Sequence, residues 1–163
     1  MDFFRHRRAS FIGSPALVLL IAATGCSPAD DNASAAVPSP GTKATKLCQN
    51  LDKSLPRKVD GLDREDPEPR SALTAGWGSP AIILRCGVRR PAEMLDPKAS
   101  TTVVNGVAWL VQERDNGSYV FTTGLRRAYV EVRFSKEQAG KGAGPLVDFA
   151  APIKKAIPEG IAD

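Results

Sequence analysis

The sequence predicts an α+β domain, in which two helices pack on one face of an antiparallel sheet of about five strands. Two of the observations behind this prediction are apolar stripes at spacings of three and four, one beginning near Thr42 and one after Pro145. The third is the stretch between them, where short apolar runs are separated by Gly, Pro, Asn and Asp, as strands joined by turns are. Residues 42–158 are therefore expected to form a single domain.

The first helix is expected to have Thr42 as its N-cap and to end before Pro56, because proline lacks the backbone donor that continues a helix. The spacing of its apolar residues places them on one side of the helix, which predicts that this side faces the sheet. The stripe includes one cysteine, and its members are Ala44, Leu47, Cys48, Leu51 and Leu55.

Residues 81–88 form an apolar run that Arg85 interrupts and turn residues bound, which predicts a mostly buried strand. We expect it to be the central strand of the sheet, preceded by a strand within residues 71–77. Residues 59–70 are interpreted as a solvated loop. Four of its acids offer the hard oxygens that calcium prefers, but their spacing matches no EF-hand loop; they are Asp63, Glu65, Asp66 and Glu68.

Three further strands are expected after an irregular connection. Residues 102–113 are rich in valine and are interpreted as one strand. Asn116-Gly117 then predicts a tight hairpin to a strand at residues 119–123, because both residue types tolerate positive φ. Residues 127–134 alternate between apolar and more polar side chains, which is typical of a half-buried strand.

The last helix is expected to begin at Pro145, since proline suits the first helical position. Pro152 lies within the helix and predicts a kink or a restart there, and Pro158 ends it. The apolar stripe that faces the sheet consists of Leu146, Phe149, Ala150, Ile153 and Ile157.

The N-terminus has the features of a secretory signal. Arg5, Arg7 and Arg8 precede an apolar run at residues 11–23, which is too short for a typical transmembrane helix. The small residues before Cys26 resemble a bacterial lipobox, so we expect residues 1–25 to be removed and Cys26 to carry palmitate-type acyl chains. Cleavage near Ala36 and an uncleaved anchor are the alternatives. Residues 26–41 are small, polar and proline-bearing, and are expected to be a flexible tether.

Two cysteines remain in the expected domain, Cys48 and Cys86. Small exported domains usually oxidise such a pair, so we expect a disulfide between them. The alternative is two buried thiols.

Composition excludes several kinds of chemistry. The single histidine, His6, lies in the expected leader, so the mature chain has no imidazole for a catalytic triad or for a histidine-containing metal site. We expect no cofactor and no metal. The net charge of +4 falls to +2 when the leader, with three arginines and Asp2, is removed. Without a basic stripe this charge does not favour nucleic acid as a partner.

A candidate ligand site lies on the sheet face expected to point away from the helices. If Cys86 points to the helices, Arg85 points away from them. There arginines and aromatics would suit an anionic or sugar ligand, by bidentate hydrogen bonding and stacking. The candidates are Arg85, Trp77, Trp109, Tyr129 and Arg133. The alternatives are that Arg85 pairs with Glu131 or Glu113 and that both tryptophans belong to the core.

These features favour a non-catalytic, lipid-anchored binding module on the outer face of the cytoplasmic membrane. Its partner would be an envelope protein or an anionic ligand. One alternative is a structural accessory subunit of a membrane complex. Another is a hydrolase that uses Glu113 and Glu131 as paired carboxylates. Arg126-Arg127 also suits phospholipid head groups, although two charges in a turn are common.

Four short motifs, taken together, resemble a known family. They are W-G-S-P from Trp77, L-R-C-G-V from Leu84, V-N-G-V-A-W from Val104 and R-A-Y-V-E-V from Arg127. In this order and spacing they resemble the domain of unknown function 3515 family of exported actinobacterial proteins, over about residues 47–157. The resemblance implies an envelope-associated protein and no assigned activity.

Overall fold

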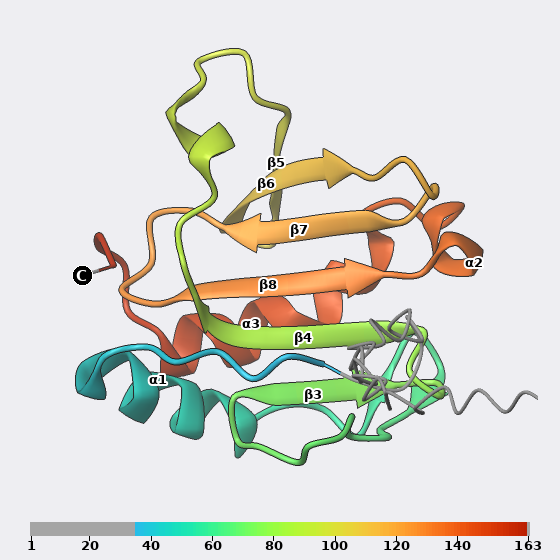
Figure 1. The fold of residues 1–163 in the computed structure, drawn as a ribbon, viewed down its shortest axis with the longest axis horizontal. Helices are drawn as coiled ribbons and strands as arrows, with labels where there is room; N and C mark the ends of the chain where they lie inside the picture. The colour runs from blue at the N-terminus through green and yellow to red at the C-terminus, as the bar shows by residue number, and fades with distance from the viewer. Residues whose placement is uncertain (1–34, 163) are drawn as a thin grey trace, which may run out of the picture.

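The computed structural model describes residues 35–162, and these residues form an α+β domain (Figure 1). Its main sheet has six antiparallel strands in the order β3-β4-β8-β7-β6-β5, so the predicted fold class is confirmed. In sheet order the strands are β3 (Thr74–Trp77), β4 (Ile82–Val88), β8 (Tyr129–Phe134), β7 (Tyr119–Thr123), β6 (Val107–Glu113) and β5 (Thr101–Val104). The expected signal peptide, the expected lipidation site Cys26 and the first part of the expected tether lie outside the described residues.

The remaining elements are short or helical. Strands β1 (Lys58–Val59) and β2 (Leu62–Asp63) make a small separate hairpin. The α-helices are α1 (Thr42–Asp52), α2 (Lys136–Ala139) and α3 (Val147–Ala156), and η1 (Ala92–Leu95) and η2 (Gly144–Leu146) are 3-10 turns. None of the helices in residues 35–162 is both long enough and apolar enough to cross a membrane.

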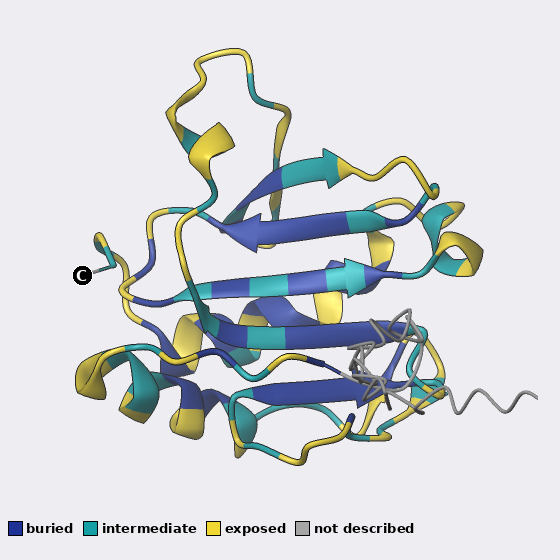
Figure 2. Ribbon diagram, viewed as in Figure 1, coloured by how far each residue is buried: buried dark blue, intermediate teal, exposed yellow. Residues whose placement is uncertain are grey.

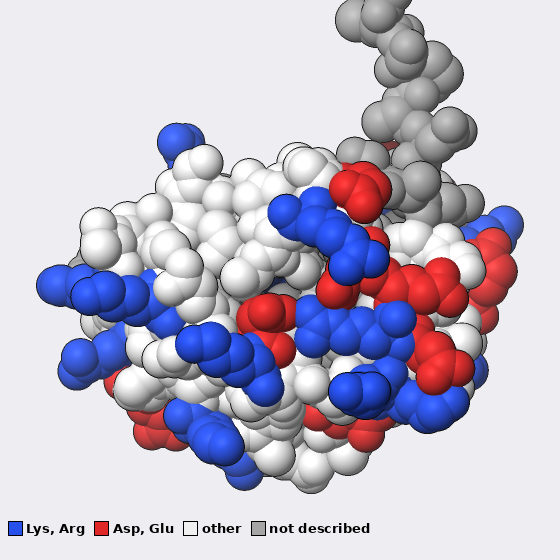
Figure 3. All heavy atoms as spheres, turned by 90° about the horizontal axis from the view of Figure 1, so that it is seen from below, with Lys and Arg blue, Asp and Glu red and all other residues white. Residues whose placement is uncertain are grey.

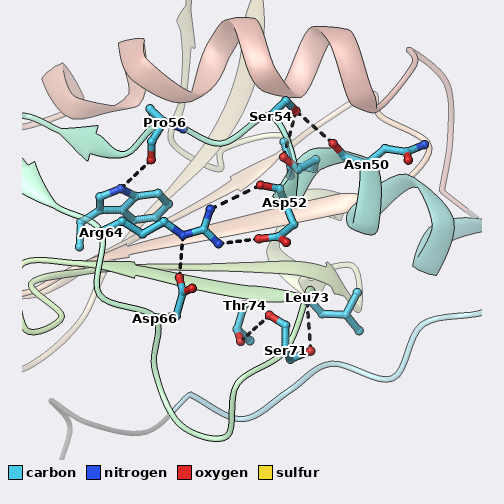
Figure 4. Close-up of polar contacts among 11 residues, drawn as sticks. Asn50, Asp52, Ser54, Pro56, Arg64, Asp66, Ser71, Leu73 and Thr74 are labelled. Atoms are coloured by element: carbon cyan, nitrogen blue, oxygen red, sulfur yellow. Dashed lines mark hydrogen bonds and ion pairs between the residues drawn. The ribbon is translucent and has the colours of Figure 1, made fainter.

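Helix α1 begins and ends earlier than its sequence suggests. Gly41 occupies the N-cap and Thr42 is already helical, so the predicted cap is wrong by one position. At the other end the hydroxyl of Ser54 donates to the carbonyls of Asn50 and Leu51, which satisfies acceptors of the last turn before Pro56 is reached (Figure 4).

Helix α3 is continuous through Pro152, so the expected restart does not occur. Pro145 lies in the 3-10 turn η2 just ahead of the helix and not at its first position. Pro152 removes only one intrahelical hydrogen bond, the one to the carbonyl of residue 148, and that residue stands in the first turn. Packing of Phe149 and Ile153, both fully buried, stabilises the helix on the sheet.

The sheet differs from its prediction in two places. The strand expected to be central, β4, lies next to the edge strand β3. The stretch expected to be one strand, residues 102–113, is a hairpin of β5 and β6, because Asn105 and Gly106 form a two-residue turn with φ of 46° and 80°. The hairpin predicted at Asn116-Gly117 is confirmed, although only Gly117 has a positive φ there.

Both long helices cover the same face of the sheet and enclose the core with it. In Figure 1, α3 lies behind the sheet and α1 lies beside its lower end. Cys48 of α1 and Cys86 of β4 form a disulfide with their Cα atoms 5.5 Å apart. Trp77 of β3 packs edge-on against Phe149 of α3, with ring centroids 5.1 Å apart. The two helices are thus fixed to β3 and β4.

The last residues of the expected tether pack against the domain. Residues 35–41 run in front of β3 and β4, on the side of the sheet away from α3 (Figures 1 and 2). Ala35 is 4% exposed, and its amide donates to the carbonyl of Glu68 at 3.2 Å. The guanidinium of Arg85 donates to the carbonyl of Ala36 at 2.9 Å. The described part of this segment is therefore an integral part of the fold.

Gly87 of β4 packs closely against this segment. Its φ is +85°, and a Cβ there would lie 2.5 Å from Cγ of Pro40. We expect Gly87→Ala to lower the free energy of unfolding by about 1–3 kcal/mol, because it adds backbone strain to a steric clash. Hydrogen exchange should show faster exchange at Ala35 and Ala36. Gly140→Ala is the matched control, since no atom lies within 4 Å of its added Cβ. Equal stability of the two variants would contradict the prediction.

Candidate functional site

The register of the main sheet sorts its side chains onto two faces. Leu84, Val132 and Phe121 lie opposite one another across β4, β8 and β7 and belong to the core under the helices. The adjacent row points to the other side, which we call the outer face. Its members, in strand order from β4 to β5, are Arg85, Glu131, Thr122, Leu110 and Thr101.

Arg85 lies on the outer face, but other parts of the chain already occupy its guanidinium. One nitrogen contacts Glu131 at 3.2 Å, where the side chains are 25% and 15% exposed. Another donates to Ala36 in the segment that crosses this face. The arrangement matches the alternative in which Arg85 pairs with Glu131, and it leaves little of this charge for a ligand.

The two tryptophans lie on the opposite side of the sheet from Arg85. Trp77 and Trp109 are 0% and 1% exposed and belong to the core cluster under the helices. The indole of Trp77 donates to the carbonyl of Pro56 at 3.1 Å. The structure therefore does not bring the tryptophans together with the outer-face candidates.

Tyr129 and Arg133 do lie on the outer face, at opposite ends of β8. Arg133 lines a small cavity of about 190 Å³ with Lys136 and forms no ion pair within residues 35–162. Tyr129 lines a larger groove at the other end. The five candidates thus do not form one site.

The two acids considered as a catalytic pair lie on opposite faces. Glu131 is in the outer-face row, whereas Glu113 is paired in register with Tyr119, which lies opposite the core residue Phe134. A hydrogen bond from the Tyr119 hydroxyl to Glu113 raises the pKa of that tyrosine. This geometry does not provide the shared cleft that paired-carboxylate hydrolysis needs.

The acidic loop has cationic partners from the chain itself. Arg64 lies between Asp52, at 2.5 Å, and Asp66, at 2.7 Å (Figure 4). Burial by itself would lower the pKa of Arg64, but hydrogen bonds to these two acids outweigh it and the pKa is raised. Asp63 pairs with Lys58. The described part of the chain holds no cluster of acids, cysteines or histidines that would bind a metal.

A hollow that no sequence pattern predicts lies on the outer face. It is a cavity of about 440 Å³ between the β4–β5 connection and the ends of β5, β6 and β7, and we call it the apolar groove. Three of its lining residues are large apolar side chains that are strongly exposed: Val103 at 70%, Leu125 at 73% and Ile161 at 77%. Leu95, at 68%, lies in η1 beside Met94, which also lines the groove.

A buried arginine holds the rim of the groove in place. Arg126 is 4% exposed and donates to the carbonyls of Ile157 and Gly106 at 3.1 and 3.3 Å. It is therefore engaged in the fold and does not stand free for a phospholipid head group. The amide of Gly160 donates to the carbonyl of Leu125, which places Leu125 and the C-terminal residues side by side.

Charge is mixed on the face seen in Figure 3. Acidic side chains gather toward one side, where basic ones are interspersed with them, while the other side is mostly basic and uncharged. A nucleic-acid surface usually has a continuous basic stripe. The mixed pattern does not have that form.

A comparison with known families finds one match. A family model described as "Protein of unknown function (DUF3515)" matches residues 13–162. No curated protein and no solved structure matches the chain.

Proposed function

This chain belongs to the DUF3515 family of proteins of unknown function, and from that premise we propose that it is a lipid-anchored, non-catalytic binding module of the cell envelope. Its binding surface is the apolar groove. The ligand is an apolar group, presented by an envelope protein or by membrane lipid.

The single observation that carries the proposal is the clustering of exposed apolar side chains around the groove. Scattered apolar residues are normal on a protein surface, but a contiguous patch around a hollow is typical of an interaction site. Val103, Leu125 and Ile161 come from three separate parts of the chain and meet at this one place. Its lining is also more apolar than that of the small cavity beside Arg133.

The leader supports the proposed location. Arginines, an apolar run and small residues before Cys26 together favour export and lipidation. Two or three acyl chains hold a protein on a bilayer almost permanently, since each buried methylene contributes about 0.8 kcal/mol. The module would then work on the outer face of the cytoplasmic membrane. Mass spectrometry of the mature N-terminus tests this part, and an unmodified Cys26 would contradict it.

Photo-crosslinking in living cells tests the groove. A photoreactive amino acid replaces Val103 on the groove or, as a matched control, Val147, which is 49% exposed on α3. We expect discrete adducts from position 103, to a protein or to lipid, and none of the same kind from position 147. A partner recovered in a fixed ratio would favour the accessory-subunit alternative. Identical adduct patterns at the two positions would refute the groove as the binding surface.

A further inference from the structure

We propose that the groove side of the domain docks on the surface of an anionic bilayer, with the exposed apolar side chains of the groove entering its interfacial layer. This inference rests on the proposed lipid anchor and names the occupant of the proposed binding surface. Four observations carry it.

The first is the backbone of Leu125. Its φ is 52°, a left-handed conformation that is unfavourable for a bulky L-residue, and its side chain is 73% exposed. A glycine in this turn would avoid the strain and the exposure together. The chain instead holds a large apolar side chain outward in a strained conformation, which indicates a use outside the fold.

The second is the arrangement of the apolar side chains. Leu125 and the C-terminal Ile161 lie together through the Gly160 hydrogen bond. Val103 of the edge strand β5 and Met94 of η1 border the same groove. Such a set of protruding apolar tips suits a lipid interface, where each tip inserts separately.

The third is the charge beside these tips. Arg89, Arg90, Lys98 and Arg127 are exposed and form no ion pair within residues 35–162. Glu93 and Asp96 offset part of this charge. Exposed, unpaired cations next to apolar tips complement anionic head groups.

The fourth is the length and position of the tether. Eight residues, 27–34, separate Cys26 from Ala35, and an extended chain of that length spans at most about 30 Å. Ala35 is fixed on the outer face by its hydrogen bond to Glu68. An acylated Cys26 therefore keeps Ala35 within about 30 Å of the membrane, a reach that allows the outer face, on which the groove also lies, to contact the bilayer.

Fluorescence quenching by lipid tests the orientation. The mature lipoprotein is reconstituted in vesicles of phosphatidylcholine and phosphatidylglycerol that contain spin-labelled lipid. An environment-sensitive fluorophore is placed on one added cysteine, since Cys26 is acylated and Cys48 and Cys86 are bonded to each other. The labelled variants are Leu125→Cys and Ile161→Cys on the groove and Val147→Cys on α3.

We expect loss of most of the fluorescence from positions 125 and 161 and little loss from position 147. Absence of quenching at the groove, or equal quenching at all three positions, overturns the inference. If the protein stays on vesicles without groove quenching while position 103 crosslinks to a protein in cells, bilayer docking fails and the proposed function stands. A protein that leaves the vesicles overturns the anchor and this inference with it.

Additional substitutions, made in the protein that carries the fluorophore at position 161, separate an effect on docking from an effect on folding. Leu125→Gly relieves the backbone strain, so it should leave the domain folded and reduce the quenching. Arg89→Glu with Arg90→Glu should reduce the quenching in anionic vesicles, whereas Lys53→Glu with Arg57→Glu, in the connection between α1 and β1, should not. Unchanged quenching in both groove variants overturns the inference.

Discussion

Replacing Cys48 and Cys86 together by alanine is expected to lower the free energy of unfolding by about 4 kcal/mol. The two residues are separated by 38 positions, and a cross-link across a loop of that length restricts the unfolded chain. This amount is a large share of the roughly 5–15 kcal/mol that stabilises a small domain. Thermal unfolding followed by circular dichroism should show a midpoint lower by roughly 15 °C.

The native protein in a reducing agent is the control for this experiment. It should unfold at the same temperature as the double variant, because both lack the same cross-link. A double variant as stable as the oxidised protein would show that the disulfide does not contribute to the stability of the domain. Cys26 lies ahead of the described residues and is left unchanged in both samples.

Replacing Trp77 by alanine is expected to cost about 3–5 kcal/mol, as large-to-small changes of buried aromatics do. Trp77 is fully buried, and its loss leaves a cavity beside Phe149. It also leaves the carbonyl of Pro56 without its donor and removes the ring that faces Arg64 at 6.0 Å. Chemical denaturation measures the difference.

Two further variants show where this stability comes from. Trp77→Phe keeps an aromatic ring but loses the hydrogen bond to Pro56, so it should cost less than the alanine change. Tyr129→Ala removes a half-exposed aromatic from the outer face and is expected to cost about 1 kcal/mol or less. A loss at position 77 as small as that at position 129 would mean that Trp77 does not anchor the core.

Local patterns predicted much of the fold because the physics they report is local. The alternation in residues 127–134 appears in β8 as buried Val130, Val132 and Phe134 between partly exposed neighbours. The apolar stripe around Cys48 faces the sheet, as expected. Cys86, the disulfide partner of Cys48, is the only other cysteine of the expected domain. Periodicity and cysteine pairing thus predicted the fold class and the helix layer.

Such local patterns do not predict the order of the strands in the sheet. β4 pairs with β8, some forty-five positions later in the chain, and nothing in either segment specifies its neighbour. Asn105-Gly106 is a hairpin-turn signal within residues 102–113. The valines on both sides nevertheless give this stretch the appearance of one long strand. Both central residues of that turn have positive φ, which is the requirement that Asn-Gly meets.

The site was the least predictable part, for a physical reason. Leu125, Val103 and Ile161 lie in a turn, an edge strand and the C-terminal tail, where neighbouring residues give no periodic indication of exposure. Side-chain chemistry alone points to Arg85 and Arg133 as ligand residues, whereas the fold uses Arg85 in an internal ion pair with Glu131. The one available signal was a leucine beside Gly124 in a turn, where polar residues are more usual.

The packing of residues 35–41 has a mechanical consequence for any protein held at its N-terminal end. A pull ahead of Ala35 loads its contacts in series, first with Glu68 and then with Arg85, so the segment peels away one contact at a time. Unravelling stops at Cys48, because the disulfide passes the tension directly to β4, which is paired with a strand on each side. The segment before Cys48 can therefore extend under force, while the main sheet stays folded.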